Sequence, residues 1–159
     1  MIPIKALVIV SSHRASTGVY EDRSGPILVE GLRKFDFEVG SAQVVDDGEP
    51  LALALADAIA AGYQLIITSG GTGLSPTDVT PEITIPLLTR QIPGIAEAIR
   101  LYGINHDVKN AALSRGVAGL VGKTLVINIA GSPGAARDGL VVLATFLPHA
   151  LAQISGGDH

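Results

Sequence analysis

The chain has 159 residues, of which 47% are hydrophobic and 4% aromatic, with no cysteine and a formal net charge of −4. This length and hydrophobic content fit one domain, over residues 1–159, and exclude a disordered chain, while the lack of cysteine excludes disulfides and thiolate metal sites. The acidic balance without a basic run argues against nucleic acid as a partner, and the absence of a membrane-length apolar stretch or a secretory leader favours a cytoplasmic protein without membrane contact.

Alternating strands and helices are predicted for the first part of the chain. Residues 5–10 form a short apolar strand, and the polar stretch over 11–22 is expected to be a loop. Ser24-Gly25-Pro26 begins a helix that runs to about residue 35, where apolar residues recur at helical spacing. A second strand is expected over 38–45. Pro50 then opens an Ala- and Leu-rich helix that Gly62 ends.

The second part of the chain continues the alternation. A third strand is expected over 65–68 and a helix over 80–89, bent at Pro86 because proline cannot donate the hydrogen bond to the carbonyl four residues earlier. A helix from Pro93 through Leu101 follows. The remaining predicted elements are strands over 114–121 and 124–129 around a Gly122-Lys123 hairpin turn, and a last helix over 135–147 with Pro148 beyond it. Together these elements indicate an α/β three-layer sandwich with a mostly parallel sheet and an antiparallel edge hairpin.

The stretch over 68–82, here called the Gly-rich segment, reads Thr-Ser-Gly-Gly-Thr-Gly-Leu-Ser-Pro-Thr-Asp-Val-Thr-Pro-Glu. It leads from a strand into a helix start, with Thr80 expected as the N-cap and Pro81 as the first helical residue. Its glycines let backbone amides approach an anion, and the carboxylate of Asp78 would then require a cation, most simply Mg²⁺. The segment lacks the endings of the P-loop and dinucleotide fingerprints. A tight connection without a ligand is the alternative.

Polar loops follow the predicted parallel strands, whose carboxyl ends share one edge of the sheet. They contain Ser-Ser-His-Arg at 11–14, Asp46-Asp47, the glycines of the Gly-rich segment, and Gly-Ser-Pro-Gly at 131–134. Two acidic loops, Asp46-Asp47 and the one with Asp78, could meet at this edge, and Mg²⁺ is usually held by one or two carboxylates together with substrate phosphates. This grouping favours phosphoryl or nucleotidyl transfer, which depends on positioning and charge neutralisation. No nucleophile triad points to acyl transfer, and the scarcity of aromatic residues disfavours a glycosidase. The Asp46-Asp47 pair also fits a simple turn and helix entry.

Five ordered blocks resemble the molybdopterin adenylyltransferase family of molybdenum cofactor biosynthesis, the Mog/MoaB-like proteins. They cover nearly all of the chain: Val8 to Asp22, Val44 to Pro50, the Gly-rich segment, Leu113 to Gly116, and Asn128 to Gly134. The Gly-Gly-Thr-Gly and Asp-Val-Thr-Pro-Glu runs are highly specific. The chain departs from the family pattern at His13, where Asp is usual, and at Ala130, where Pro is usual.

The resemblance implies the fold of the molybdenum cofactor biosynthesis proteins and a Mg²⁺-dependent transfer of AMP from ATP to the phosphate of molybdopterin, with release of pyrophosphate. It implies that Asp78 and Asp47 are the catalytic and metal-binding carboxylates, with Asp46 adjoining. The implied residues of the pterin and phosphate site are Ser69, Gly70, Gly71, Thr72, Gly73, Ser75, Ser114, Gly131, Ser132 and Pro133. Arg115 is either structural or part of a subunit contact, and Glu82 is either a helix-cap carboxylate or a hydrogen-bond acceptor behind the site.

The resemblance also implies a homotrimer and a downstream molybdate-insertion protein as a partner. A catalytically silent sibling that only binds the pterin is the alternative, and His13 is the feature that leaves it open. The same fold occurs as a module of larger molybdate-insertion proteins, but the 159-residue length without a linker favours a free-standing domain.

Overall fold

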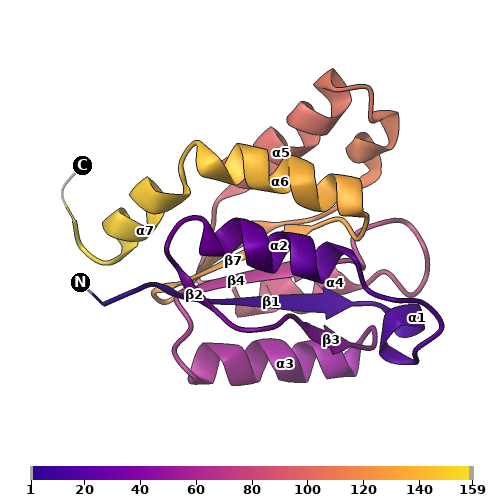
Figure 1. The fold of residues 1–159 in the computed structure, drawn as a ribbon, viewed down its shortest axis with the longest axis horizontal. Coiled ribbons are helices and arrows are strands. Elements are labelled where there is room, and N and C mark those ends of the chain that lie inside the picture. The colour runs from indigo at the N-terminus through magenta and orange to yellow at the C-terminus, as the bar shows by residue number, and fades with distance from the viewer. Residues whose placement is uncertain (1, 158–159) are drawn as a thin grey trace.

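The computed structural model describes residues 2–157 as a seven-stranded sheet between two layers of helices (Figure 1). The strands are β1 (Lys5–Ser11), β2 (Glu38–Val39), β3 (Gln43–Val45), β4 (Leu65–Ser69), β5 (Arg90–Gln91), β6 (Ala118–Val121) and β7 (Thr124–Ile129). Their order is β2-β1-β4-β7-β6-β5, and β3 also pairs with β1. The ladders among β1, β2, β3, β4 and β7 are parallel, whereas those of β6 with β5 and β7 are antiparallel. The predicted sandwich with an antiparallel edge hairpin is therefore confirmed.

The helices cover both faces of the sheet. They are α1 (His13–Ser16), α2 (Ser24–Arg33), α3 (Glu49–Ala60), α4 (Thr80–Thr84), α5 (Pro93–Asn105), α6 (Pro133–Ala144) and α7 (Leu147–Ile154), with 3₁₀ turns η1 (Ile85–Leu87) and η2 (Lys109–Leu113). Helices α2, α5, α6 and α7 pack on one face, and α3 with α4 and η1 on the other.

Side chains alternate along each central strand, as the two-residue period of a strand requires. In β4, Leu65 and Ile67 join the core under α2 and α6, while Ile66 joins the core under α3. All three are fully buried. Burial on both faces explains why this strand reads as an unbroken apolar run.

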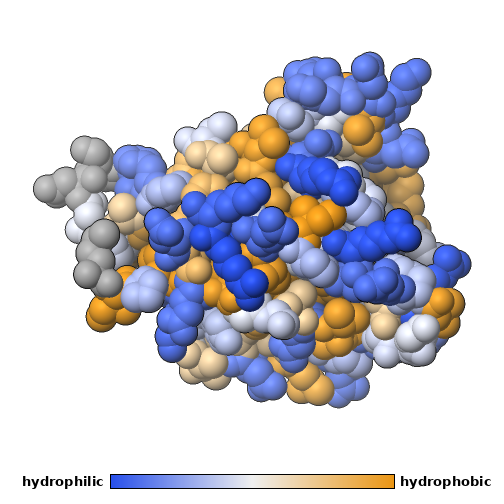
Figure 2. Space-filling view, in the orientation of Figure 1, coloured by the Kyte–Doolittle hydropathy of each residue, from blue (hydrophilic) through white to orange (hydrophobic). Residues whose placement is uncertain are grey.

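The outer surface mixes hydrophilic and hydrophobic residues in the view of Figure 2, with hydrophilic residues gathered over α2 at its centre. Within residues 2–157, no helix combines the length and apolar character needed to cross a membrane.

Several predicted boundaries are wrong. The strand expected over 38–45 is two strands, β2 and β3, which pair with opposite ends of β1. The loop expected over 11–22 contains α1, whose N-cap Ser12 accepts a hydrogen bond from the Ala15 amide. Thr80 is not an N-cap, because Val79 holds that position. The helix expected over 80–89 ends at Thr84, and Pro86 lies in the 3₁₀ turn η1.

The C-terminal half also differs from the prediction. Helix α5 continues past Leu101 to Asn105, and strand β6 begins at Ala118 rather than 114. The last predicted helix, over 135–147, corresponds to α6, which ends at Ala144. Helix α7 was not predicted, and Pro148, which was expected to follow the last helix, lies in its first turn. Proline is tolerated there because a first-turn amide has no partner within its helix.

Candidate active site

One large cavity, of about 1130 Å³, opens at the carboxyl ends of the parallel strands. Four loops line it, as the strand order predicted: 11–14 after β1, Asp47 after β3, 70–74 after β4, and 130–135 after β7. The fifth wall comes from α5 and the segment 108–116. Of the twelve residues assigned to the site from the sequence, all except Ser75 line this cavity.

The Gly-rich segment turns sharply as it leaves β4. Gly70 and Gly71 have φ of 102° and 69°, a region that residues with a Cβ rarely adopt. A Cβ at Gly70 would collide with the carbonyl of Ser11, and one at Gly71 with the hydroxyl of Thr80. These two glycines are therefore required by the turn itself, before any ligand is considered.

Three successive amides of this turn are free to bind a ligand. The Gly70 amide is occupied, because it donates to the carbonyl of Ile129 at 2.9 Å. By contrast, the amides of Gly71, Thr72 and Gly73 donate no hydrogen bond within the described part of the chain. Free amides at such a turn form an anion-binding concavity, so the cradle predicted over 70–73 is restricted to three residues.

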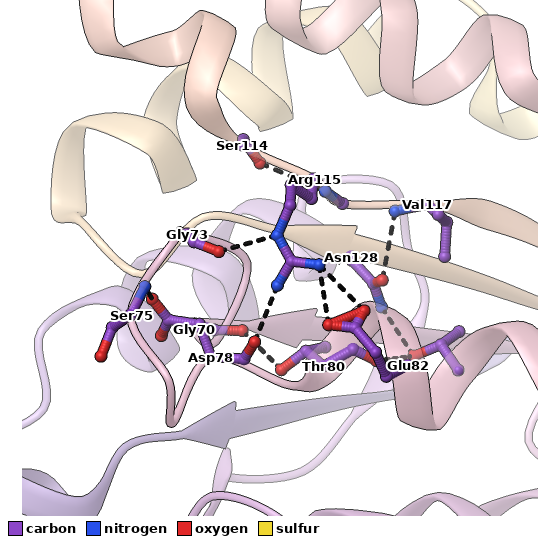
Figure 3. A network of polar contacts seen from close by, with 12 residues as sticks. Gly70, Gly73, Ser75, Asp78, Thr80, Glu82, Ser114, Arg115, Val117 and Asn128 are labelled. Atoms are coloured by element: carbon purple, nitrogen blue, oxygen red, sulfur yellow. Dashed lines mark hydrogen bonds and ion pairs between the residues drawn. The ribbon is translucent and has the colours of Figure 1, made fainter.

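A buried polar network supports the turn from below (Figure 3). The Thr80 hydroxyl donates to the Gly70 carbonyl at 2.9 Å, and the Thr84 hydroxyl donates to the Thr80 carbonyl at 2.8 Å. The Asn128 amide group donates to the hydroxyls of Thr68 and Thr84 at 2.9 and 3.1 Å. This network links β4, β7 and α4 to the turn, and it explains why Thr80 serves the loop rather than the helix end.

Arg115 holds the Gly-rich segment from the side (Figure 3). Its Nε donates to the Gly73 carbonyl at 2.8 Å, and its Nη2 to the Asp78 carbonyl at 2.7 Å. Its Nη1 pairs with both carboxylate oxygens of Glu82, at 2.7 and 2.9 Å. Of the two roles considered for Glu82, the structure shows the hydrogen-bond acceptor behind the site.

Asp78 lies half-buried at the cavity wall. Its Oδ2 accepts a hydrogen bond from the amide of Ser75 at 3.0 Å, and its Oδ1 has no partner within residues 2–157. The Ser75 hydroxyl bonds to that of Thr77 at 3.2 Å. Ser75 therefore contacts Asp78 through its backbone, and its side chain does not line the cavity.

Asp47 faces the same cavity from the loop after β3. The Ser11 hydroxyl donates to its Oδ1 at 2.7 Å, and its Oδ2 is unpartnered in the described chain. Asp46 lies behind it, where its carboxylate accepts hydrogen bonds from His13 at 3.0 Å and from the Asp47 amide at 2.7 Å. These two bonds, His13 first, hold the pKa of Asp46 below its ordinary value.

The side chains of the three remaining predicted serines each form a hydrogen bond within the protein. Gly131 and Ser132 precede α6, and Ser132 caps that helix by accepting from the Ala135 amide at 3.0 Å. The Ser114 hydroxyl donates to that of Thr72 at 3.1 Å. The fully buried Ser69 donates to Ser24 at 3.0 Å.

Asp22 and Arg100 are among the cavity residues that were not assigned to the site from the sequence. Asp22 accepts from the Ser24 hydroxyl at 3.1 Å, which extends the chain of hydroxyls from Ser69, and its position just before a helix start was a usable signal. Arg100 lines the cavity from α5 and donates through Nη1 to the carbonyls of Ser114 and Gly116, at 3.2 and 3.0 Å. No sequence pattern separates Arg100 from an ordinary surface residue of an amphipathic helix.

The residues present fit Mg²⁺ shared with a phosphate ligand, and do not form a closed metal cage. No group of three or more His, Cys, Asp or Glu side chains that could hold a metal occurs in residues 2–157. Asp47 and Asp78, however, each present one unpartnered carboxylate oxygen in one cavity. One or two carboxylates completed by substrate phosphates and water are the usual Mg²⁺ ligands.

The chain is similar to known proteins in both sequence and fold. The family model described as a probable molybdopterin binding domain matches residues 7–149. The chain is 34% identical over 154 residues to the molybdopterin adenylyltransferase of Helicobacter pylori, covering 94% of this chain and 86% of that protein. The solved structure of the molybdopterin biosynthesis Mog protein from Mycobacterium ulcerans has a TM-score of 0.90 and 51% identity, covering 95% of this chain and 99% of that one.

A further relative is longer than this chain. The molybdenum cofactor biosynthesis bifunctional protein of Chlorobaculum tepidum is 36% identical over 157 residues, which are 98% of this chain and 50% of that protein. The chain thus spans about half the length of the bifunctional relatives that it matches.

Proposed function

The chain belongs to the molybdopterin-binding domain family of molybdenum cofactor biosynthesis, and we propose that it is a molybdopterin adenylyltransferase. In the proposed reaction an oxygen of the molybdopterin phosphate bonds to the α-phosphorus of ATP. The bond from that phosphorus to the bridging oxygen of the β-phosphate breaks, and pyrophosphate leaves. The product is adenylylated molybdopterin.

The observation that carries the proposal is the meeting of two kinds of group in one cavity. The free amides of Gly71, Thr72 and Gly73 suit phosphate oxygens, and the half-free carboxylates of Asp47 and Asp78 suit a cation. Neither group alone explains the other, because carboxylates repel phosphate in the absence of a cation.

These residues would act by binding and orientation. Gly71, Thr72 and Gly73 would hold phosphate oxygens, and the loop of Gly131, Ser132 and Pro133, which lies beside Gly70, would form a second wall. The Ser114 hydroxyl donates to that of Thr72, which leaves the hydrogen of the Thr72 hydroxyl as one further donor for the ligand. Asp47 and Asp78 would hold Mg²⁺, which supplies charge neutralisation of the transferring phosphate when bound.

The volume of the cavity supports two substrates. At about 1130 Å³ it exceeds the roughly 300–1,000 Å³ of a usual single-ligand pocket. This room suits a pterin phosphate and a nucleotide bound side by side, as direct transfer between them requires.

We extend the proposal to the setting of the protein. Residues 1–159 act as one molybdopterin-binding domain in the cytoplasm, assemble as a homotrimer, and pass the product to a downstream molybdate-insertion protein. The proposal covers only the half of the bifunctional relatives that this chain matches.

The deciding experiment is incubation of the protein with molybdopterin and Mg-ATP. Pyrophosphate release together with a product whose mass is larger by one AMP unit is expected, and omission of Mg²⁺ should abolish both. A protein that binds molybdopterin but releases no pyrophosphate would instead be the catalytically silent sibling.

A further inference from the structure

We propose that Arg115 is a positioning residue, which fixes the free amides of the Gly-rich segment and Asp78 in their working arrangement; this inference rests on the proposed function. The first observation is where its bonds go. Nε and Nη2 donate to the carbonyls of Gly73 and Asp78, at 2.8 and 2.7 Å, and these residues flank the exposed tip at 74–77. The Arg115 amide also donates to the Thr72 carbonyl at 2.8 Å.

The second observation is that all three nitrogens of this guanidinium already donate hydrogen bonds to protein oxygens. Its charge is paired with Glu82, and the residue does not line the cavity. Arg115 therefore does not reach the substrate phosphates directly. It acts through the backbone of the segment: its side chain donates to the carbonyls of Gly73 and Asp78, and its amide donates to the carbonyl of Thr72.

The third observation is that these simultaneous hydrogen bonds require the planar shape of the arginine side chain. A planar guanidinium presents several donors in a fixed fork, so one side chain satisfies two carbonyls and a carboxylate at once. A lysine ammonium keeps the charge but lacks this fork. The ion pair with Glu82 is itself partly exposed, at 38% and 51% of the two side chains, so it is expected to contribute less than the carbonyl bonds.

The test compares Arg115→Met, Arg115→Lys and Glu82→Gln with wild type. Arg33→Met is the matched control, since Arg33 also holds a carbonyl, that of Val39, through Nε and Nη2 at 3.1 and 2.9 Å, away from the cavity. Thermal unfolding curves first show which variants are folded, and only these are compared. Hydrogen exchange of the peptide over 71–82, molybdopterin affinity, turnover and the Mg²⁺ concentration for half-maximal rate are then measured.

Arg115→Met should accelerate exchange at 71–82, where the Ser75 and Asp78 amides now form local hydrogen bonds. Turnover should fall about 10²-fold, because misplacement of a reacting group by about 1 Å has this effect, and the required Mg²⁺ should rise. Arg115→Lys should resemble Arg115→Met, Glu82→Gln should be milder, and Arg33→Met should match wild type in all four measurements. If Arg115→Met does not fold, Arg115→Lys is compared with wild type and with Arg33→Met in its place.

Two results would overturn the proposal: unchanged exchange at 71–82 in the Arg115 variants, or full recovery of turnover in Arg115→Lys, which would show that charge alone matters. A wild type that never releases pyrophosphate defeats the proposed function instead. In that event exchange and molybdopterin affinity still decide whether Arg115 positions the segment.

Discussion

Ser75 and Asp78 are joined by a reciprocal pair of hydrogen bonds. The Ser75 amide donates to Oδ2 of Asp78 at 3.0 Å, and the Asp78 amide donates to the Ser75 carbonyl at 2.9 Å. The pair fixes one carboxylate oxygen and leaves the other unpartnered within residues 2–157. The orientation of Asp78 is therefore determined by backbone geometry three residues away.

This relationship predicts that the side chain of Ser75 is dispensable while its amide is not. Ser75→Ala should retain turnover within about twofold, as expected for a surface substitution that breaks no backbone contact. Ser75→Pro removes the amide hydrogen and should reduce turnover strongly. Pyrophosphate release by both variants is the measurement. Equal loss in the two variants would assign the role to the hydroxyl instead.

The glycines of the turn give a second prediction. Gly71→Val combines a φ of 69° with a collision against Thr80, and Gly73→Val places a Cβ 2.8 Å from Oδ2 of Asp78. Both should abolish molybdopterin binding, the first by distorting the cradle and the second by placing a Cβ where the backbone must approach the ligand. Gly40→Val is the control, because nothing lies within 4 Å of a Cβ there. Calorimetric titration of folded variants measures the effect, and full affinity in either would refute the cradle.

His13 and Asp46 give a prediction for pH dependence. Because His13 donates to Asp46, the pKa of Asp46 is lowered, and His13→Ala should raise it toward its ordinary value. The stabilisation is present above the ordinary pKa of an Asp, about 4, and is lost as pH falls through the lowered value. Carbon-detected NMR titration of the Asp46 carboxyl measures this shift. An unchanged pKa would show that the Asp47 amide alone is responsible.

The sequence predicted the central elements because their patterns are local. The apolar runs of β1, β4 and β7 and the Pro and Gly boundaries of α3 are properties of short windows. Strand β5, by contrast, consists of the exposed Arg90 and Gln91, and it exists only because it pairs with β6. No hydrophobic period reveals such a strand.

The candidate site divides in the same way. The loops that follow parallel strands were predictable, because the topology places their ends on one edge. The contacts between them were not, since Arg115 and Glu82 are separated by 33 residues and Ser11 and Asp47 by 36. Arg100 was not predictable, because only the folded chain brings this residue of α5 to the cavity.

The proposed assembly is tested by light scattering. At micromolar concentration we expect a particle of three times the mass of the chain, because the family resemblance implies a trimer, and a three-fold ring closes through one repeated heterologous interface. Sedimentation velocity at several concentrations provides a second measurement. A monomer across that range would contradict the trimer.

The last prediction concerns the three carboxylates and separates an enzyme from a binding module. Asp78→Asn keeps the shape of the side chain but removes its charge, and loss of an electrostatic group of this kind reduces turnover by about 10²–10³, or roughly 3–4 kcal/mol. Molybdopterin affinity should fall much less, because the amides of Gly71, Thr72 and Gly73 remain. Asp47→Asn should behave similarly, with a larger loss of nucleotide and Mg²⁺ affinity.

Asp46→Asn is the matched control for these two variants, since Asp46 does not line the cavity and holds only the Asp47 amide and His13. Its effect should be milder than either. Pyrophosphate release at saturating Mg-ATP, measured beside molybdopterin affinity, compares the three with wild type. Near wild-type turnover in Asp78→Asn would remove its catalytic role. The same loss in all three variants would mean that these carboxylates contribute net charge to the cavity and that Asp47 and Asp78 are not specific Mg²⁺ ligands.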